Sequence, residues 1–113
     1  MGLTLEQTYT ISVGDTEVID VDFTPRLRDT ESLTGTPTVV EITTSDLTLA
    51  NKGVNTAEYE NTVNGKTVAV GAGVQFSIAG GNAANSPYTI QVTVSTDGTP
   101  TRTMTRYLTI SFA

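Results

Sequence analysis

Apolar and polar residues alternate with a period of two along most of this chain, and that alternation limits its fold more than any other feature. Residues 88–95 read YTIQVTVS, so that every second side chain is apolar. Residues 17–23 and 74–78 show the same alternation. Successive side chains of a β-strand point to opposite faces, so these runs predict strands with one buried and one solvated face. Helical periodicity is not evident along the chain.

Turn-forming residues separate these runs. Gly, Asn, Asp and Pro gather at residues 14–15, 24–25, 79–87 and 97–100. About seven short strands at a spacing of roughly 8 to 12 residues predict an all-β, Ig-like β-sandwich of antiparallel strands, with a small barrel as the alternative. The 23 threonines favour strands as well. Because 113 residues suit one domain, we expect a single sandwich domain over residues 1–113.

Four segments carry more specific expectations. The last two strands should form a hairpin at Asp97-Gly98. Residues 26–36 should form a short helical turn or a loop that buries Leu27 and Leu33. Residues 51–64 have the weakest pattern, so we expect the longest loop or a weak edge strand there. Arg106 interrupts an apolar strand face and should reach outward at the wetter end of its strand.

Charge and composition exclude several classes of protein. The net charge of −6 and the scattered basic residues are opposite to what phosphate binding requires, so we expect no direct nucleic-acid partner. The chain has no Cys, no run of about 20 apolar residues and no signal-like pattern in MGLTLEQTYTIS. We therefore expect a soluble protein that is made in the cytoplasm, has no disulfide framework and does not enter a membrane.

Enzymatic chemistry has little support in the sequence. Without His or Cys, the usual nucleophilic triads and zinc sites cannot be built, and the chain has no Trp to serve as a sugar platform. The glycines of GAGVQF at residues 71–76 precede a strand and lack the Lys of a phosphate loop, so they indicate a turn or bulge. We expect no catalytic residue, no cofactor and no resident metal.

Asp20 and Asp22 are the candidate site residues with the most ambiguous meaning. On a strand, residues two apart share a face and lie about 6 to 7 Å from each other. Such a pair suits a calcium site or general acid–base chemistry, but neighbouring acids fall on other expected elements. A solvated strand face is the favoured interpretation. Partner contact or loop capping is the second, and a metal site is the third.

Arg26 and Arg28 flank Leu27 next to this acid pair. A local network with Asp22, Asp29 or Glu31 is the favoured interpretation. Partner contact is the alternative, because Arg is over-represented at interface hot spots. Asp20, Asp22, Arg26 and Arg28 are thus the candidate partner-contact residues.

Two segments resemble the short Ig-like structural proteins of tailed-bacteriophage virions, of the head-decoration and fibre–tail adaptor types. The first is IDVDFTPRLRDTESLTG, residues 19–35, where the family often has a Trp in place of Arg26. The second is FSIAGGNAANSPYTIQVTVSTDG, residues 76–98.

The resemblance implies a virion component present in symmetric copies, a homo-oligomer in its assembly, with no active site. Its partners would be the major capsid protein or tail and portal proteins. The alternative is a free-standing β-sandwich that binds a carbohydrate or a receptor.

Overall fold

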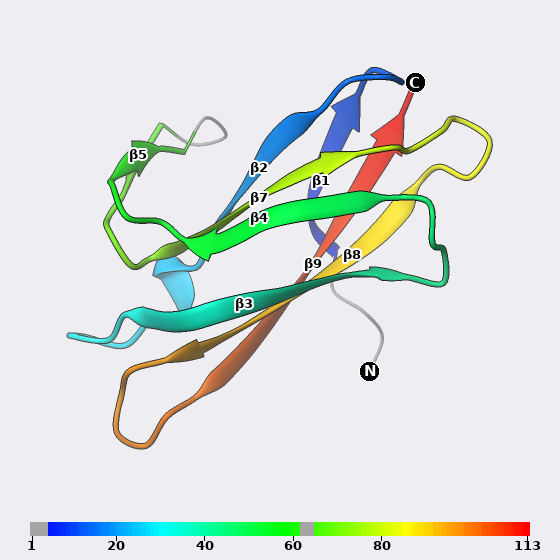
Figure 1. The fold of residues 1–113 in the computed structure, drawn as a ribbon. Helices are drawn as coiled ribbons and strands as arrows, with labels where there is room; N and C mark the ends of the chain where they lie inside the picture. The colour runs from blue at the N-terminus through cyan, green and yellow to red at the C-terminus, as the bar shows by residue number, and fades with distance from the viewer. Residues whose placement is uncertain (1–4, 62–64) are drawn as a thin grey trace.

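Two β-sheets make up most of the protein. The computed structural model describes residues 5–61 and 65–113, and its strands are β1 (Leu5–Ile11), β2 (Glu17–Asp22), β3 (Leu33–Ile42), β4 (Thr48–Val54), β5 (Tyr59–Glu60), β6 (Thr67–Val68), β7 (Gly73–Ala79), β8 (Tyr88–Thr96) and β9 (Thr103–Phe112). One 3₁₀ turn, η1 (Thr24–Arg26), follows β2. The sheets have the orders β1-β9-β8-β3 and β2-β7-β4, and β5 pairs with β6 in a small ribbon (Figure 1). The expected all-β sandwich is confirmed.

The strand pairs are antiparallel, as expected, with the exception of β1 and β9. β8 and β9 are antiparallel and joined by the hairpin that the Asp97-Gly98 turn predicts. β1 pairs with β9 in parallel, from Gln7 opposite Leu108 to Ile11 opposite Phe112, whereas antiparallel strands were expected. The chain reverses at residues 12–16 after β1, so β1 lies on the four-stranded sheet while β2 begins the other sheet.

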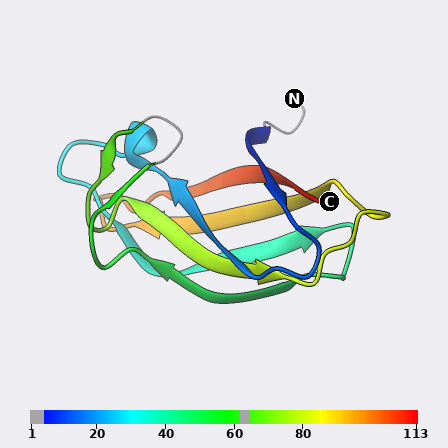
Figure 2. The ribbon, with the colours of Figure 1, turned by 90° about the horizontal axis from the view of Figure 1, so that it is seen from above.

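The core lies between the two layers (Figure 2). The inward side chains of β2 and β7 oppose those of β8 and β9, and all are nearly fully buried. They include Ile19, Val21, Val74, Phe76, Ile78, Ile90, Val92, Val94, Leu108, Ile110 and Phe112. Burial of this apolar surface is the main source of stability in a chain of this size. Of the two expected leucines, Leu33 is buried and Leu27 packs partly buried against this core.

Tyr88 fixes the corner at which the chain enters β8. Its ring is 1 % exposed and meets the ring of Phe112 edge-on, with the centroids 5.8 Å apart. Its hydroxyl donates to Asp46 Oδ2 at 2.8 Å and accepts from the backbone N–H of Asn82 at 3.1 Å. This arrangement is similar to the tyrosine corner of Ig-like sandwiches, in which a Tyr near the start of the same strand bonds back to the upstream backbone.

The weakly patterned segment 51–64 is divided between several elements. Its first residues belong to β4, which is an edge strand of the three-stranded sheet, and residues 59–60 form β5. Of the two alternatives, a long loop or a weak edge strand, the edge strand is therefore correct for residues 51–54. Residues 62–64 lie outside the described residues.

Candidate functional site

Three segments that are distant in sequence meet at one end of the sandwich. They are residues 24–32 before β3, residues 69–72 before β7 and the β8–β9 hairpin at residues 97–102. We call this surface the loop end, and it lies at the left in Figure 1. The backbone N–H of Leu33 donates to the carbonyl of Gly71 at 2.7 Å, and that of Asp97 donates to the carbonyl of Ser32 at 2.9 Å. Backbone bonds therefore fix all three segments to one another.

An ion pair between the buried Glu31 and the half-buried Arg102 supports the loop end. The Glu31 side chain is 3 % exposed, and both of its carboxylate oxygens accept from the Arg102 guanidinium, with Nε donating to Oε2 at 3.2 Å. The backbone N–H of Arg28 also donates to Glu31 Oε1 at 2.9 Å. The bonds from Arg102 and then from Arg28 lower the pKa of the Glu31 carboxyl to about 2, so Glu31 is ionised at neutral pH.

Arg102 connects the hairpin to η1 as well as to Glu31. Its Nη2 donates to the carbonyl of Arg26 at 2.8 Å, and its backbone N–H donates to Thr96 Oγ1 at 3.1 Å. A methyl group at Gly98 would lie 2.7 Å from Glu31 Oε2, so the close approach of the hairpin to this carboxylate requires glycine. One side chain therefore holds η1, the tip of the β2–β3 loop and the hairpin in a fixed arrangement.

Ser32 and Asp97 form a second clamp beside the ion pair. The Ser32 backbone N–H donates to Asp97 Oδ1 at 2.8 Å, and the Asp97 backbone N–H donates to the Ser32 carbonyl. Two reciprocal bonds across 65 residues of sequence leave little freedom for either loop. These bonds hold the loop end in place on the sandwich, as a scaffold positions binding loops.

The tip of this loop contains a strained threonine. The N–H of Glu31 donates to the Arg28 carbonyl at 3.1 Å, which closes a β-turn over Asp29 and Thr30. Thr30 has φ of 63°, in the left-handed region that glycine or asparagine normally occupies at this turn position. For a β-branched residue this conformation is a clear outlier, and such outliers concentrate at ligand-binding and active sites.

A shallow groove crosses the loop end between the strained turn and residues 69–72. Its volume is about 290 Å³, and it has an apolar part made by Leu27, Ala69, Ala72 and Val70. Val70 is 57 % exposed, so its apolar side chain is open to solvent. Arg28 and Asp29 form the charged rim. An apolar groove with a charged rim suits contact with another protein better than it suits catalysis.

The predicted arginine network is different in the structure. The partner of Glu31 is Arg102 rather than Arg26 or the guanidinium of Arg28. Arg26 Nη1 donates to the carbonyl of Thr105 at 2.6 Å, at a part of β9 that has no β1 residue opposite it. The Arg28 side chain is exposed and forms no ion pair or hydrogen bond with the described residues. Of the two candidates, Arg28 is therefore the one free to meet a partner.

Arg106 also departs from its expectation. Its guanidinium lies 5.8 Å from the ring centroid of Phe23 and donates from Nη1 to the carbonyl of Asp22. The side chain is half-buried, so it closes one end of the core instead of extending into solvent. A cation over an aromatic face combined with a backbone acceptor explains this inward position.

Asp20 and Asp22 lie together on the outer face of β2, as the alternation predicts, but each is already hydrogen-bonded. Asp20 Oδ1 accepts from Gln75 Nε2 at 2.7 Å, and Gln75 is its direct neighbour on β7. Asp22 Oδ1 accepts from the backbone N–H of Thr24 at 2.9 Å, at the start of η1, and its Oδ2 accepts from Asn61 Nδ2 at 3.3 Å. Asp22 thus has the loop-capping geometry that was the second interpretation.

A small pocket of about 90 Å³ adjoins the acid pair and is also lined by Tyr9 and Tyr59. The Tyr59 hydroxyl is buried above Gly73, where an added methyl group would lie 2.4 Å from it, and it has no hydrogen-bond partner in the described part of the chain. Burial and then the charges of Asp20 and Asp22 raise the Tyr59 pKa well above its ordinary value. Within residues 5–61 and 65–113, no group of three or more acidic side chains is placed to hold a metal ion.

The residues that sequence reasoning missed are Arg102 and Val70. The turn at residues 97–100 predicts that Arg102 lies at the hairpin end of the last strand. No local pattern in the sequence indicates that Arg102 meets Glu31. Val70 lies between the short strand β6 and β7, where no alternation of apolar and polar residues indicates which side chains are exposed.

Comparison of the chain with protein-family models, with curated proteins and with solved structures finds no match. Among the residues described here, no helix has the length and the apolar character that crossing a bilayer requires.

Proposed function

We propose that this chain is a non-enzymatic structural protein of a tailed-phage virion. In this proposal it binds capsid or tail components in symmetric copies, as a decoration protein or a fibre–tail adaptor. The observation that carries the proposal is the loop end, where the Glu31–Arg102 ion pair holds an exposed turn at Arg28, Asp29 and Thr30. A scaffold that fixes an exposed, charged loop beside an apolar groove is suited to recognition.

The two segments that resemble the phage family converge on this surface. Residues 19–35 include β2, η1, the strained turn and the start of β3, while residues 76–98 run from β7 through β8 to the hairpin. Their contact is the reciprocal pair of bonds between Ser32 and Asp97. The resemblance therefore covers residues 24–32 and the start of the hairpin, which are parts of two of the three segments that build the loop end, and this supports the same location for partner binding.

The positions of the aromatic residues favour this proposal over a carbohydrate-binding module. Sugar recognition usually relies on aromatic rings open to solvent, and every Tyr and Phe of this chain is buried or half-buried. Tyr88 and all three Phe lie in the core. The described surface thus offers charged and apolar contacts rather than aromatic platforms.

Binding to isolated virion parts tests the proposal. The purified chain is mixed with emptied shells and, separately, with portal–tail complexes of a phage that encodes it, and binding is measured by co-sedimentation. We expect Arg28→Glu to weaken binding by at least tenfold, because Arg is enriched among interface hot spots, whose loss costs about 2 kcal/mol or more. The matched control is Lys52→Glu on β4, which reverses the charge of a residue that does not line the groove and should leave binding unchanged.

The partner that binds decides between the two positions. Binding to shells with a higher resistance to rupture supports a decoration protein, and binding only to portal–tail complexes supports an adaptor. Binding to neither, together with binding to a glycan array, would overturn the proposal in favour of a free-standing carbohydrate-binding module.

A further inference from the structure

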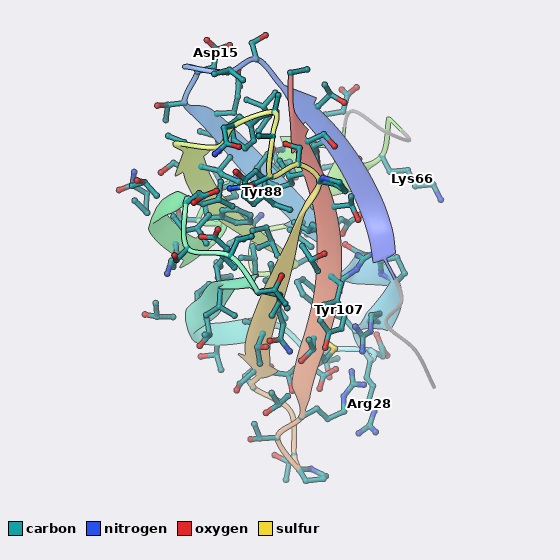
Figure 3. The ribbon with its side chains drawn as sticks, turned by 90° about the vertical axis from the view of Figure 1, so that its right-hand side faces the viewer. Asp15, Arg28, Lys66, Tyr88 and Tyr107 are labelled. Atoms are coloured by element: carbon teal, nitrogen blue, oxygen red, sulfur yellow. The ribbon has the colours of Figure 1, made fainter. Side chains whose placement is uncertain are left out.

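The outer face that β3, β8 and β9 form in the four-stranded sheet has no charged side chain among its described residues. We call it the uncharged face. Alternation and register place on it the outward residues Thr34, Thr38, Val40, Ile42, Thr89, Gln91, Thr93, Ser95, Thr103, Thr105, Tyr107, Thr109 and Ser111. Figure 3 shows β8 and β9 side by side, with Tyr107 labelled. In a chain with 12 acidic and 6 basic residues, so large a face without charge is a distinctive feature.

The polar groups in the middle of the uncharged face bond to one another. Gln91 Nε2 donates to the Tyr107 hydroxyl at 3.1 Å, and the hydroxyls of Thr93 and Thr105 lie 3.3 Å apart. Val40 adds an apolar side chain that is 38 % exposed. Hydroxyl groups that are already paired within the sheet lose little when water is displaced. The centres of protein interfaces are likewise poor in charge and rich in Tyr.

The opposite face of the sandwich has a different character. Asp20 and Asp22 lie on the outer side of β2, and Glu17 is exposed at its start. Glu60 lies beside them at the 90 Å³ pocket. Two copies that met through this side would bring like charges together, which costs free energy. Since each chain carries a net charge of −6, the uncharged face is a surface on which the described residues present no acidic side chain to a second copy.

We propose that the uncharged face is a self-association surface and that its occupant is the same face of a second copy. Two such sheets would stack about 10 Å apart with their strands nearly aligned, as sheets do within a sandwich. Three strands about 4.8 Å apart and eight residues of about 3.4 Å cover roughly 400 Å² per copy. Standard stable interfaces bury about 800 Å² per partner, so the contact is weak between free chains and gains strength when other contacts hold the copies together.

Charge substitutions at the centre of the face test this inference on the purified chain alone, without shells or tails. Sedimentation equilibrium between about 5 µM and 1 mM should show the mass of the wild-type chain rising from 11.9 kDa towards twice that value. Thr93→Glu and Thr93→Lys each place a like charge opposite its copy and should remain at 11.9 kDa. In such a pair the two copies of residue 93 would lie within about a Debye length of each other. An equal mixture of Thr93→Glu and Thr93→Lys should therefore associate again, because opposite charges then face each other.

The matched control places the same charge on the other sheet. Val18 is 65 % exposed on β2, and Val18→Glu should associate as the wild type does. Thermal melting of all variants checks that each is folded. A wild-type mass that stays at 11.9 kDa, or association of Thr93→Glu alone as strong as that of the wild type, would overturn the inference. Equal loss in Val18→Glu would also overturn it, because total charge would then govern association. These outcomes are independent of whether the loop end binds a virion component.

Discussion

Replacement of Thr30 by glycine should stabilise the protein while weakening its binding to a partner. The left-handed conformation costs a residue with a Cβ about 1 to 2 kcal/mol, and Thr30 is held there with φ of 63°. Glycine removes this strain but makes the unfolded chain more flexible, which costs about 0.5 to 1 kcal/mol. The expected net gain in the free energy of unfolding is about 0.5 to 1 kcal/mol.

Thermal unfolding followed by circular dichroism measures this gain. For 113 residues the entropy of unfolding is about 0.24 kcal/mol per kelvin, so Tm should rise by about 2 to 4 °C. Thr38→Gly is the matched control, because Thr38 is also exposed but lies in β3 with an ordinary backbone conformation. There glycine has no strain to relieve, and Tm should fall by a similar amount.

Binding should change in the opposite direction to stability. A glycine at residue 30 frees the turn above Glu31, and ordering a freed turn on binding costs about 0.5 to 1 kcal/mol, or roughly two- to fivefold in affinity. A fall in Tm equal to that of Thr38→Gly would refute the strain at Thr30. A rise in Tm with unchanged affinity for shells or tails would show that the turn makes no contact with the partner.

Two further predictions concern stability. The pKa of Glu31 is lowered to about 2 from its ordinary 4.5, so its ion pair with Arg102 stabilises the protein fully above about pH 4.5 and ceases to do so as the pH falls towards 2. Urea unfolding from pH 6 to pH 2 should show this loss in the wild type and a smaller pH dependence in Glu31→Gln. Gly81→Ala should lower the free energy of unfolding by about 1 to 3 kcal/mol, since the new methyl group would lie 2.1 Å from the buried Phe112 ring. Gly53→Ala, which meets no atom within 4 Å, should be nearly neutral in the same measurement.

The sequence predicted the sandwich well because the period of two carries the burial of each strand. Ile19 and Val21 are buried while Asp20 and Asp22 face outward, as the alternation requires. The pattern also located the hairpin at Asp97-Gly98. These successes concern residues whose environment is decided by their immediate neighbours in the chain.

The loop end could not be predicted in the same way. The Glu31–Arg102 pair joins positions 71 residues apart, and no local spacing indicates that they meet. The parallel pairing of β1 with β9 has the same origin, since alternation fixes the face of a strand but not its neighbour. The bond between Asp20 and Gln75 depends on the register between β2 and β7, which is likewise invisible in the sequence of either strand.

The parallel pairing of β1 and β9 has a mechanical consequence. Because the two strands run in the same direction, the start of β1 and the end of β9 lie at opposite ends of the pair (Figure 1). A force that draws these two points apart acts along the strands and loads the backbone bonds of the pair in shear, all at once. An antiparallel pair pulled from adjacent ends would instead open one bond at a time. The β1–β9 pair should therefore resist tension along its strands, because all of its backbone hydrogen bonds would have to break together.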